Sequence, residues 1–83
     1  MTGSTYDELR EIFVRVFTLP SSEDAEDAAY RQIPGWDSVG HMRLVQEIEQ
    51  QFGVLLDPED VIDMESFVAV CEVLKKYDVH ALP

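Results

Sequence analysis

The chain has 83 residues, enough for one small domain with a single thin hydrophobic core and too few for a deep, water-excluding catalytic pocket. Its 17 acidic residues outnumber 6 basic ones, and the formal net charge of -11 excludes nucleic acid and anionic membranes as natural partners. We therefore expect a non-catalytic protein whose partners present basic surfaces and bind it less well as salt rises.

The sequence predicts neither export nor insertion into a membrane. It has no charged amino-terminal region followed by an apolar run, and no stretch of about 18 apolar residues. Its one cysteine, Cys71, has no second cysteine with which to form an internal disulfide. We expect a cytoplasmic protein, and a monomer by default.

The first predicted element is a helix over residues 5–18. The run Thr5-Tyr6-Asp7-Glu8 has the form of a capping box, which starts a helix, and Leu19-Pro20 ends the pattern. Between them, apolar residues recur at helical spacing and predict one buried face. These residues are Leu9, Ile12, Phe13, Val16 and Phe17.

Residues 19–37 are expected to form a long loop. An acidic Ser-Ser-Glu-Asp-Ala-Glu-Asp run without periodicity opens it, and Ile33-Pro34-Gly35 closes it with a turn sequence. Loops longer than about 12–15 residues are uncommon in small domains unless they are functional. We expect Tyr30 and Ile33 to anchor this loop to the core.

A second long helix is predicted over residues 38–52. Asp37 or Ser38 can cap its start, and Gly53 supplies the left-handed residue that ends it. Its apolar residues recur at near-helical spacing and predict a core face. They are Val39, Met42, Val45, Ile48 and Phe52, with Leu44 beside them.

Two further helices follow, a short one over residues 58–62 and a last one over residues 66–77. Asp57 and Pro58 favour the start of the short helix, and Ser66 opens the last one. The residues expected to point inward are Val61 and Ile62 in the short helix and Phe67, Val70, Cys71 and Leu74 in the last.

The predicted fold class is all-α. The chain has no strand pattern and no internal repeat, so residues 1–83 are expected to form a single domain. We predict a small four-helix bundle with three longer helices, one short helix and a long loop between the first two helices.

The start of the second predicted helix carries a motif, Trp36-Asp37-Ser38-Val39, and the same helix ends in Phe52-Gly53. Together with the length and the charge, this pattern resembles the acyl carrier protein family. The resemblance implies a four-helix fold and a 4′-phosphopantetheine arm, taken from coenzyme A, on Ser38 with Asp37 as its motif neighbour. Further matching pieces are Glu47-Ile48-Glu49, Asp57-Pro58-Glu59-Asp60 and Phe67.

Ser38 also has a plainer interpretation, as an ordinary N-cap of the helix. The two roles are compatible with one position, because free backbone N–H groups and the helix dipole favour an anion there. No oriented imidazole base is available to activate Ser38, so the chain is expected to be a modified substrate with no catalytic residue. The resemblance implies that a magnesium-dependent phosphopantetheinyl transferase modifies it.

A serine hydrolase is the competing interpretation, since Ser38-Val39-Gly40-His41 superficially resembles a nucleophile elbow. That motif needs a glycine where this chain has Trp36, and it needs a strand before the serine. We therefore expect His41 to be an exposed helical side chain.

No metal site is predicted. Cys71, His41 and His80 do not share the spacing of a metal site, and residues 57–63 lack the glycine of a calcium loop. Cys71 is expected to be a small buried hydrophobic residue.

Contacts with partner proteins are expected at Trp36, Val39, Arg43, Gln46 and Glu47. Trp36 has two interpretations, as an anchor that packs the loop on the bundle or as an exposed contact. The resemblance implies acyl-loading, condensing or acyltransferase enzymes with basic docking surfaces as partners.

The second helix departs from the pattern of carriers in primary fatty-acid synthesis, which present a run of acidic residues there. Arg43 and Gln46 interrupt that run, and Glu47 and Glu49 are the acidic residues left in the helix. This favours polyketide or mixed secondary-metabolite biosynthesis. A peptidyl or aminoacyl carrier and an unmodified helical adaptor are the alternatives.

Overall fold

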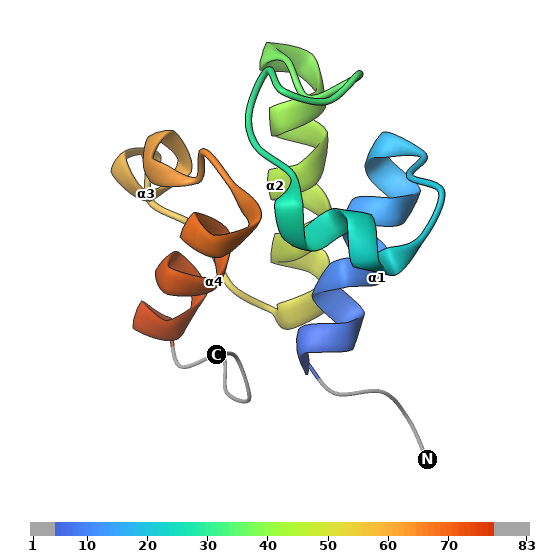
Figure 1. Ribbon diagram of the computed structural model, residues 1–83. Coiled ribbons are helices and arrows are strands. Elements are labelled where there is room, and N and C mark those ends of the chain that lie inside the picture. Colours follow the sequence, from blue (N-terminus) through green and yellow to red (C-terminus); the bar gives the residue numbers. More distant parts are fainter. Residues whose placement is uncertain (1–4, 78–83) are drawn as a thin grey trace.

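The computed structural model describes residues 5–77, and all of the regular elements in that range are helices (Figure 1). The predicted all-α class is confirmed. In chain order the elements are α1 (Thr5–Phe17), the 3₁₀ helix η1 (Ser22–Asp27), α2 (Ser38–Phe52), α3 (Pro58–Asp63) and α4 (Phe67–Lys76). Helix α1 packs on α2 and η1, while α3 pairs with α4.

An aromatic cluster holds the helices together. The Phe13 ring of α1 lies 5.0 Å from Phe67 of α4 and 5.3 Å from Trp36, between ring centroids. Phe17 stacks on Trp36 at 5.1 Å and lies 5.8 Å from Phe13. Because these rings come from α1, α4 and the segment before α2, their burial joins parts of the chain that are far apart in sequence.

The segment expected to be a structureless loop contains η1, and that expectation is wrong for Ser22–Asp27. Its turns are closed by i→i+3 bonds, such as that from the backbone N–H of Ala28 to the Ala25 carbonyl at 3.1 Å. Ala25 is fully buried, and Arg10 of α1 binds Glu26 at 2.6 Å. One buried residue in six leaves no 3.6-residue periodicity in the sequence, so the hydrophobic pattern could not reveal this helix.

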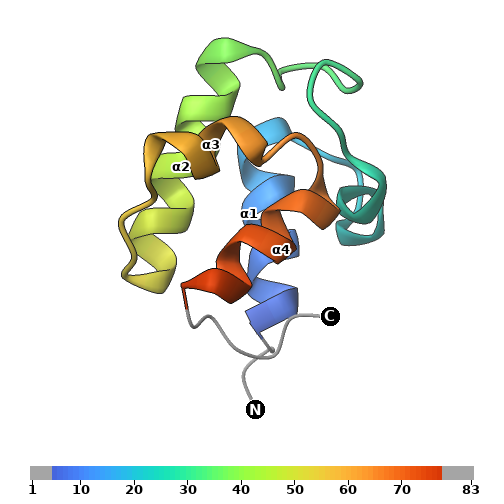
Figure 2. The same ribbon diagram turned by 90° about the vertical axis from the view of Figure 1, so that its left-hand side faces the viewer.

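The rest of the segment is tied to the start of α4 by backbone pairing. The Tyr30 N–H donates to the Glu65 carbonyl at 2.7 Å, and the Phe67 N–H donates to the Ala28 carbonyl at 3.0 Å. In both ribbon views the chain between η1 and α2 runs beside the beginning of α4 (Figures 1 and 2). This pairing places Tyr30 next to the first turn of α2.

Three residues predicted to lie on a core face are exposed, and the first of them is Val39 at the start of α2. Met42 is 52% exposed because the buried stripe of α2 runs through Leu44, Val45 and Ile48, and Met42 lies off that stripe. Ile62 is 74% exposed, since the short α3 directs Asp60 rather than Ile62 toward α4.

Candidate functional site

Ser38 is the first residue of α2, and its side chain is exposed at the end of the bundle. The helix is capped by Asp37, whose Oδ1 accepts from the Gly40 N–H at 2.9 Å. The structure thus assigns the N-cap to Asp37, and the plainer interpretation of Ser38 does not hold. The Ser38 hydroxyl is left available for chemistry, since it is not needed to complete the helix.

The first turn of α2 is held in place by a close backbone approach. A Cβ atom at Gly40 would lie 1.7 Å from the carbonyl oxygen of Gly35 and 3.3 Å from the Phe17 ring. Gly35 itself has φ of 88°, in the left-handed region that favours glycine. The turn before α2 therefore packs directly on the helix, and this packing sets the direction in which Ser38 projects.

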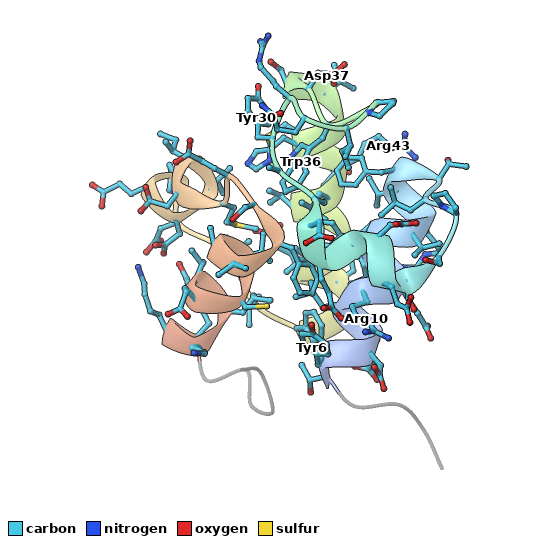
Figure 3. All side chains as sticks on the ribbon, in the orientation of Figure 1. Tyr6, Arg10, Tyr30, Trp36, Asp37 and Arg43 are labelled. Carbon is cyan, nitrogen blue, oxygen red and sulfur yellow. The ribbon has the colours of Figure 1, made fainter. Side chains whose placement is uncertain are left out.

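The Tyr30 hydroxyl lies beside the Ser38 hydroxyl, with 3.5 Å between the two oxygens. Figure 3 shows Tyr30 and Asp37 at the same end of α2. The hydrogen bond with Ser38, and after it the guanidinium of Arg31, lowers the pKa of the Tyr30 phenol. Tyr30 was predicted only as a loop anchor, because no sequence pattern indicates a tyrosine eight residues before a serine.

His41 links three parts of the site. Trp36 donates from Nε1 to His41 Nδ1 at 2.9 Å, so Nδ1 must carry a lone pair. The other ring nitrogen, Nε2, then donates to the Val61 carbonyl of α3 at 2.7 Å. The geometry selects the neutral Nε2–H tautomer of a half-buried ring, and the expectation of an exposed His41 is wrong.

This arrangement leaves no catalytic dyad at Ser38. Both nitrogens of His41 are engaged by Trp36 and Val61, and neither lies against the serine hydroxyl. Ser38 is therefore an exposed alcohol that His41 cannot activate.

The predicted partner contacts divide into buried and exposed residues. Trp36 is only 1% exposed and packs inside the aromatic cluster, so its expected role as a direct partner contact is wrong and the anchor interpretation holds. Val39 is 72% exposed, and Arg43 and Gln46 are exposed on the same face at i, i+4 and i+7. Glu47 is half-buried and binds Arg15 of α1 at 2.9 Å.

An apolar groove of about 330 Å³ opens beside Tyr30, between the start of α2 and α3. The side chains that line it are those of Tyr30, His41, Val61, Ile62, Met64 and Glu65. Sequence reasoning missed the groove because its walls come from three separate segments.

Cys71 lies in the core as expected. It is buried, and burial raises the pKa of its thiol to about 11, so the thiol stays protonated and unreactive at neutral pH.

Within residues 5–77 no three His, Cys, Asp or Glu side chains are grouped closely enough to hold a metal ion. His80, which the sequence analysis considered, lies outside the described residues. In that same part of the chain no helix has the length and apolar character needed to cross a membrane.

Comparison with known proteins gives one match. The sequence model of the family described as "Phosphopantetheine attachment site" matches residues 7–74, which is most of the chain. Searches of curated proteins and of solved structures found no significant match.

Proposed function

The chain belongs to the phosphopantetheine attachment family, and on that premise we propose that Ser38 is the residue that carries the 4′-phosphopantetheine arm. The observation that carries the proposal is the division of roles at the start of α2. Asp37 completes the helix, while Ser38 next to it is exposed and its hydroxyl has no part in capping. Proteins of this family are non-catalytic carriers that a phosphopantetheinyl transferase modifies.

The residues around Ser38 fit the group. An exposed hydroxyl at the first helical position leaves room for a long arm and for the transferase that installs it. The phenol of Tyr30 supplies a polar neighbour to the new ester, and a helix N-terminus tolerates its negative charge. When bound, the arm supplies a terminal thiol that holds cargo as a thioester.

The chain's own residues present the arm. The buried Trp36 and the His41 bridge hold the first turn of α2 against α1 and α3, so Ser38 projects from a rigid end of the bundle. Val39 and Met42 give partner enzymes an exposed apolar contact just past the serine. The chain needs no base of its own, because the transferase provides the activation of Ser38.

The experiment is an intact-mass measurement after incubation with coenzyme A, magnesium and a broad-specificity phosphopantetheinyl transferase. We expect one phosphopantetheine on the wild type and none on Ser38→Ala. Ser21→Ala, which changes another exposed serine, is the matched control and should be modified like the wild type. Modification of Ser38→Ala would overturn the assignment, and an unmodified wild type would favour the helical adaptor.

We further propose that the cargo is an acyl group of polyketide or mixed secondary-metabolite biosynthesis. In support, Arg43 places a positive charge on the exposed face of α2, and it forms no ion pair with any carboxylate of the described chain. An acidic docking helix suits basic enzyme surfaces, whereas an unpaired arginine weakens that complementarity and favours dedicated partners. Loading of the modified protein by malonyl transferases and by amino-acid-activating enzymes, read by mass, tests acyl against peptidyl cargo.

A further inference from the structure

The Tyr30 phenol lies next to Ser38, and the Arg31 guanidinium lies next to that phenol. The Tyr30 oxygen lies 3.5 Å from Ser38 Oγ, and the Arg31 guanidinium carbon lies 5.5 Å from the centre of the Tyr30 ring. Both residues precede α2 in the chain, so neither is part of the helix face on which the partner contacts were predicted.

The position of the phenol is set by packing and not by its hydroxyl. The Tyr30 N–H is bonded to the Glu65 carbonyl, and the Tyr30 ring meets Trp36 and His41 edge-on at 6.4 Å and 5.6 Å. Arg31 is held by its N–H, which donates to the Trp36 carbonyl at 2.9 Å. These contacts fix the Tyr30 ring and the Arg31 main chain, so the Tyr30 side chain loses little conformational entropy when it binds a ligand.

The charges around the site also point to an anion. Of the chain's 6 basic residues, Arg10, Arg15, Lys75 and Lys76 bind carboxylates. Arg31 has no carboxylate partner among residues 5–77 although the net charge is -11, and it is the basic residue adjacent to Tyr30. Asp37, the residue before Ser38, is engaged with the Gly40 N–H and adds repulsion that a cation must offset.

We propose that Tyr30 and Arg31 form a positioning site for the phosphodiester that joins the arm to Ser38. The inference rests on the proposed function. Once Ser38 Oγ is esterified it has no proton, and the phosphorus bonded to it carries negatively charged oxygens that can accept from the Tyr30 O–H. The Arg31 guanidinium offsets the added negative charge, which neither Tyr30 nor the acidic surface can do.

The consequence is a restricted first segment of the arm. A phosphodiester bonded to Tyr30 cannot rotate freely about Ser38, so the arm leaves the protein in one direction. Tyr30 and Arg31 are positioning residues, since the cargo thiol lies at the far end of the arm.

The test uses the fully modified protein, verified by intact mass, and compares the ³¹P NMR signal of the phosphodiester between variants. We expect Tyr30→Phe and Arg31→Gln to shift this resonance and to narrow it, because the phosphodiester then rotates more freely about Ser38. Tyr6→Phe, at the opposite end of the bundle, and Arg43→Gln, the other arginine without an ion pair in the described chain, are the matched controls and should leave it in place (Figure 3).

A second measurement needs no variant. In the unmodified protein the Ser38 hydroxyl, followed by Arg31, lowers the pKa of the Tyr30 phenol. Modification removes the Ser38 donor and adds an anion, so NMR titration of Tyr30 should show its pKa rising on modification. An unchanged ³¹P signal in Tyr30→Phe together with an unchanged Tyr30 titration would overturn this inference alone, while a wild type that takes up no phosphopantetheine would overturn the proposed function with it.

Discussion

At the scale of single residues, the site depends on one histidine and its two hydrogen bonds. His41 accepts from the indole of Trp36 and donates to the Val61 carbonyl, which joins the segment before α2 to α3. Neither bond could be read from the sequence, because Trp36 and His41 lie five residues apart across a helix start and Val61 belongs to a different element. Sequence patterns indicate periodic faces and caps, but they do not indicate pairings across loops.

The Trp36–His41 pair yields a stability prediction. His41→Ala leaves a buried indole N–H without its acceptor, and we expect a loss of about 1–3 kcal/mol in the free energy of unfolding. Urea denaturation of His41→Ala, Trp36→Phe and the double variant measures the coupling between the two residues. Additive losses would show that the hydrogen bond does not stabilise the fold.

A second prediction concerns Arg43 on the exposed face of α2. If its charge weakens recognition by basic enzymes of fatty-acid synthesis, Arg43→Glu should raise their affinity for the modified protein, most at low salt. Isothermal titration at two salt concentrations provides the measurement. The control variant is Gln32→Glu, which adds a negative charge at an exposed site outside α2. Arg15→Glu would be unsuitable as a control, because it breaks the ion pair with Glu47. Equal affinity of wild type and Arg43→Glu at low salt would mean that the charge of Arg43 does not weaken recognition by these enzymes.

At the scale of elements, the sequence was informative wherever a stripe of apolar residues and a cap coincided. The second helix occupies Ser38–Phe52, the same residues as predicted, with Gly53 in the left-handed conformation that ends it. The sequence was uninformative for η1, whose single buried residue leaves no stripe, and its apolar pattern was misleading for Val39, Met42 and Ile62. An apolar side chain near a helical stripe becomes buried only if a second element covers it, and that depends on the packing of the whole fold.

The pairing of α3 with α4 depends on a carboxylate. Asp60 accepts from Lys76 at 2.6 Å and from the Tyr77 hydroxyl, and Tyr77 in turn accepts from the Asp57 N–H at 2.9 Å. The bond from Lys76, and then that from Tyr77, lowers the pKa of the Asp60 carboxyl from its ordinary value. The network therefore favours the charged carboxylate and ties a short helix, which is too short to be stable alone, to the end of α4.

This shift makes stability depend on acid in a defined direction. A carboxyl whose pKa is lower in the folded state adds stability above its unfolded pKa, and that contribution disappears as the pH falls through the folded value. We expect Asp60→Asn to be less stable than wild type at neutral pH and to lose less stability between pH 5 and strongly acidic solution. Urea midpoints across that range provide the measurement, with Asp63→Asn, at an exposed carboxylate of the same helix, as control. If the urea midpoints of Asp60→Asn and wild type changed with pH in parallel, the charged Asp60 carboxylate would not be the group that stabilises the fold.

At the scale of the whole molecule, the net charge of -11 affects both the binding of partners and the stability of the fold. A net negative charge attracts proteins with basic surfaces. In the folded state the acidic side chains also repel one another, because they are closer together than in the unfolded chain. Residues 23–27 of η1 contribute four of these carboxylates on a small area. Screening by salt should therefore stabilise the fold while it weakens partner binding.

The prediction is a rise in the urea midpoint as sodium chloride is increased from low to physiological concentration, because the repulsion is screened most within that range. Removing part of the negative charge should reduce the rise in the urea midpoint that added salt produces. The double variant Glu23→Gln, Asp27→Asn removes two exposed carboxylates that form none of the ion pairs found in residues 5–77, and its midpoint should be higher than that of wild type at low salt and less responsive to added salt. A wild-type midpoint that falls with salt would mean that ion pairs such as Arg10–Glu26 outweigh the repulsion. After phosphopantetheine is attached, the urea midpoint should rise more with added salt, since the phosphodiester adds negative charge at the N-terminal end of α2.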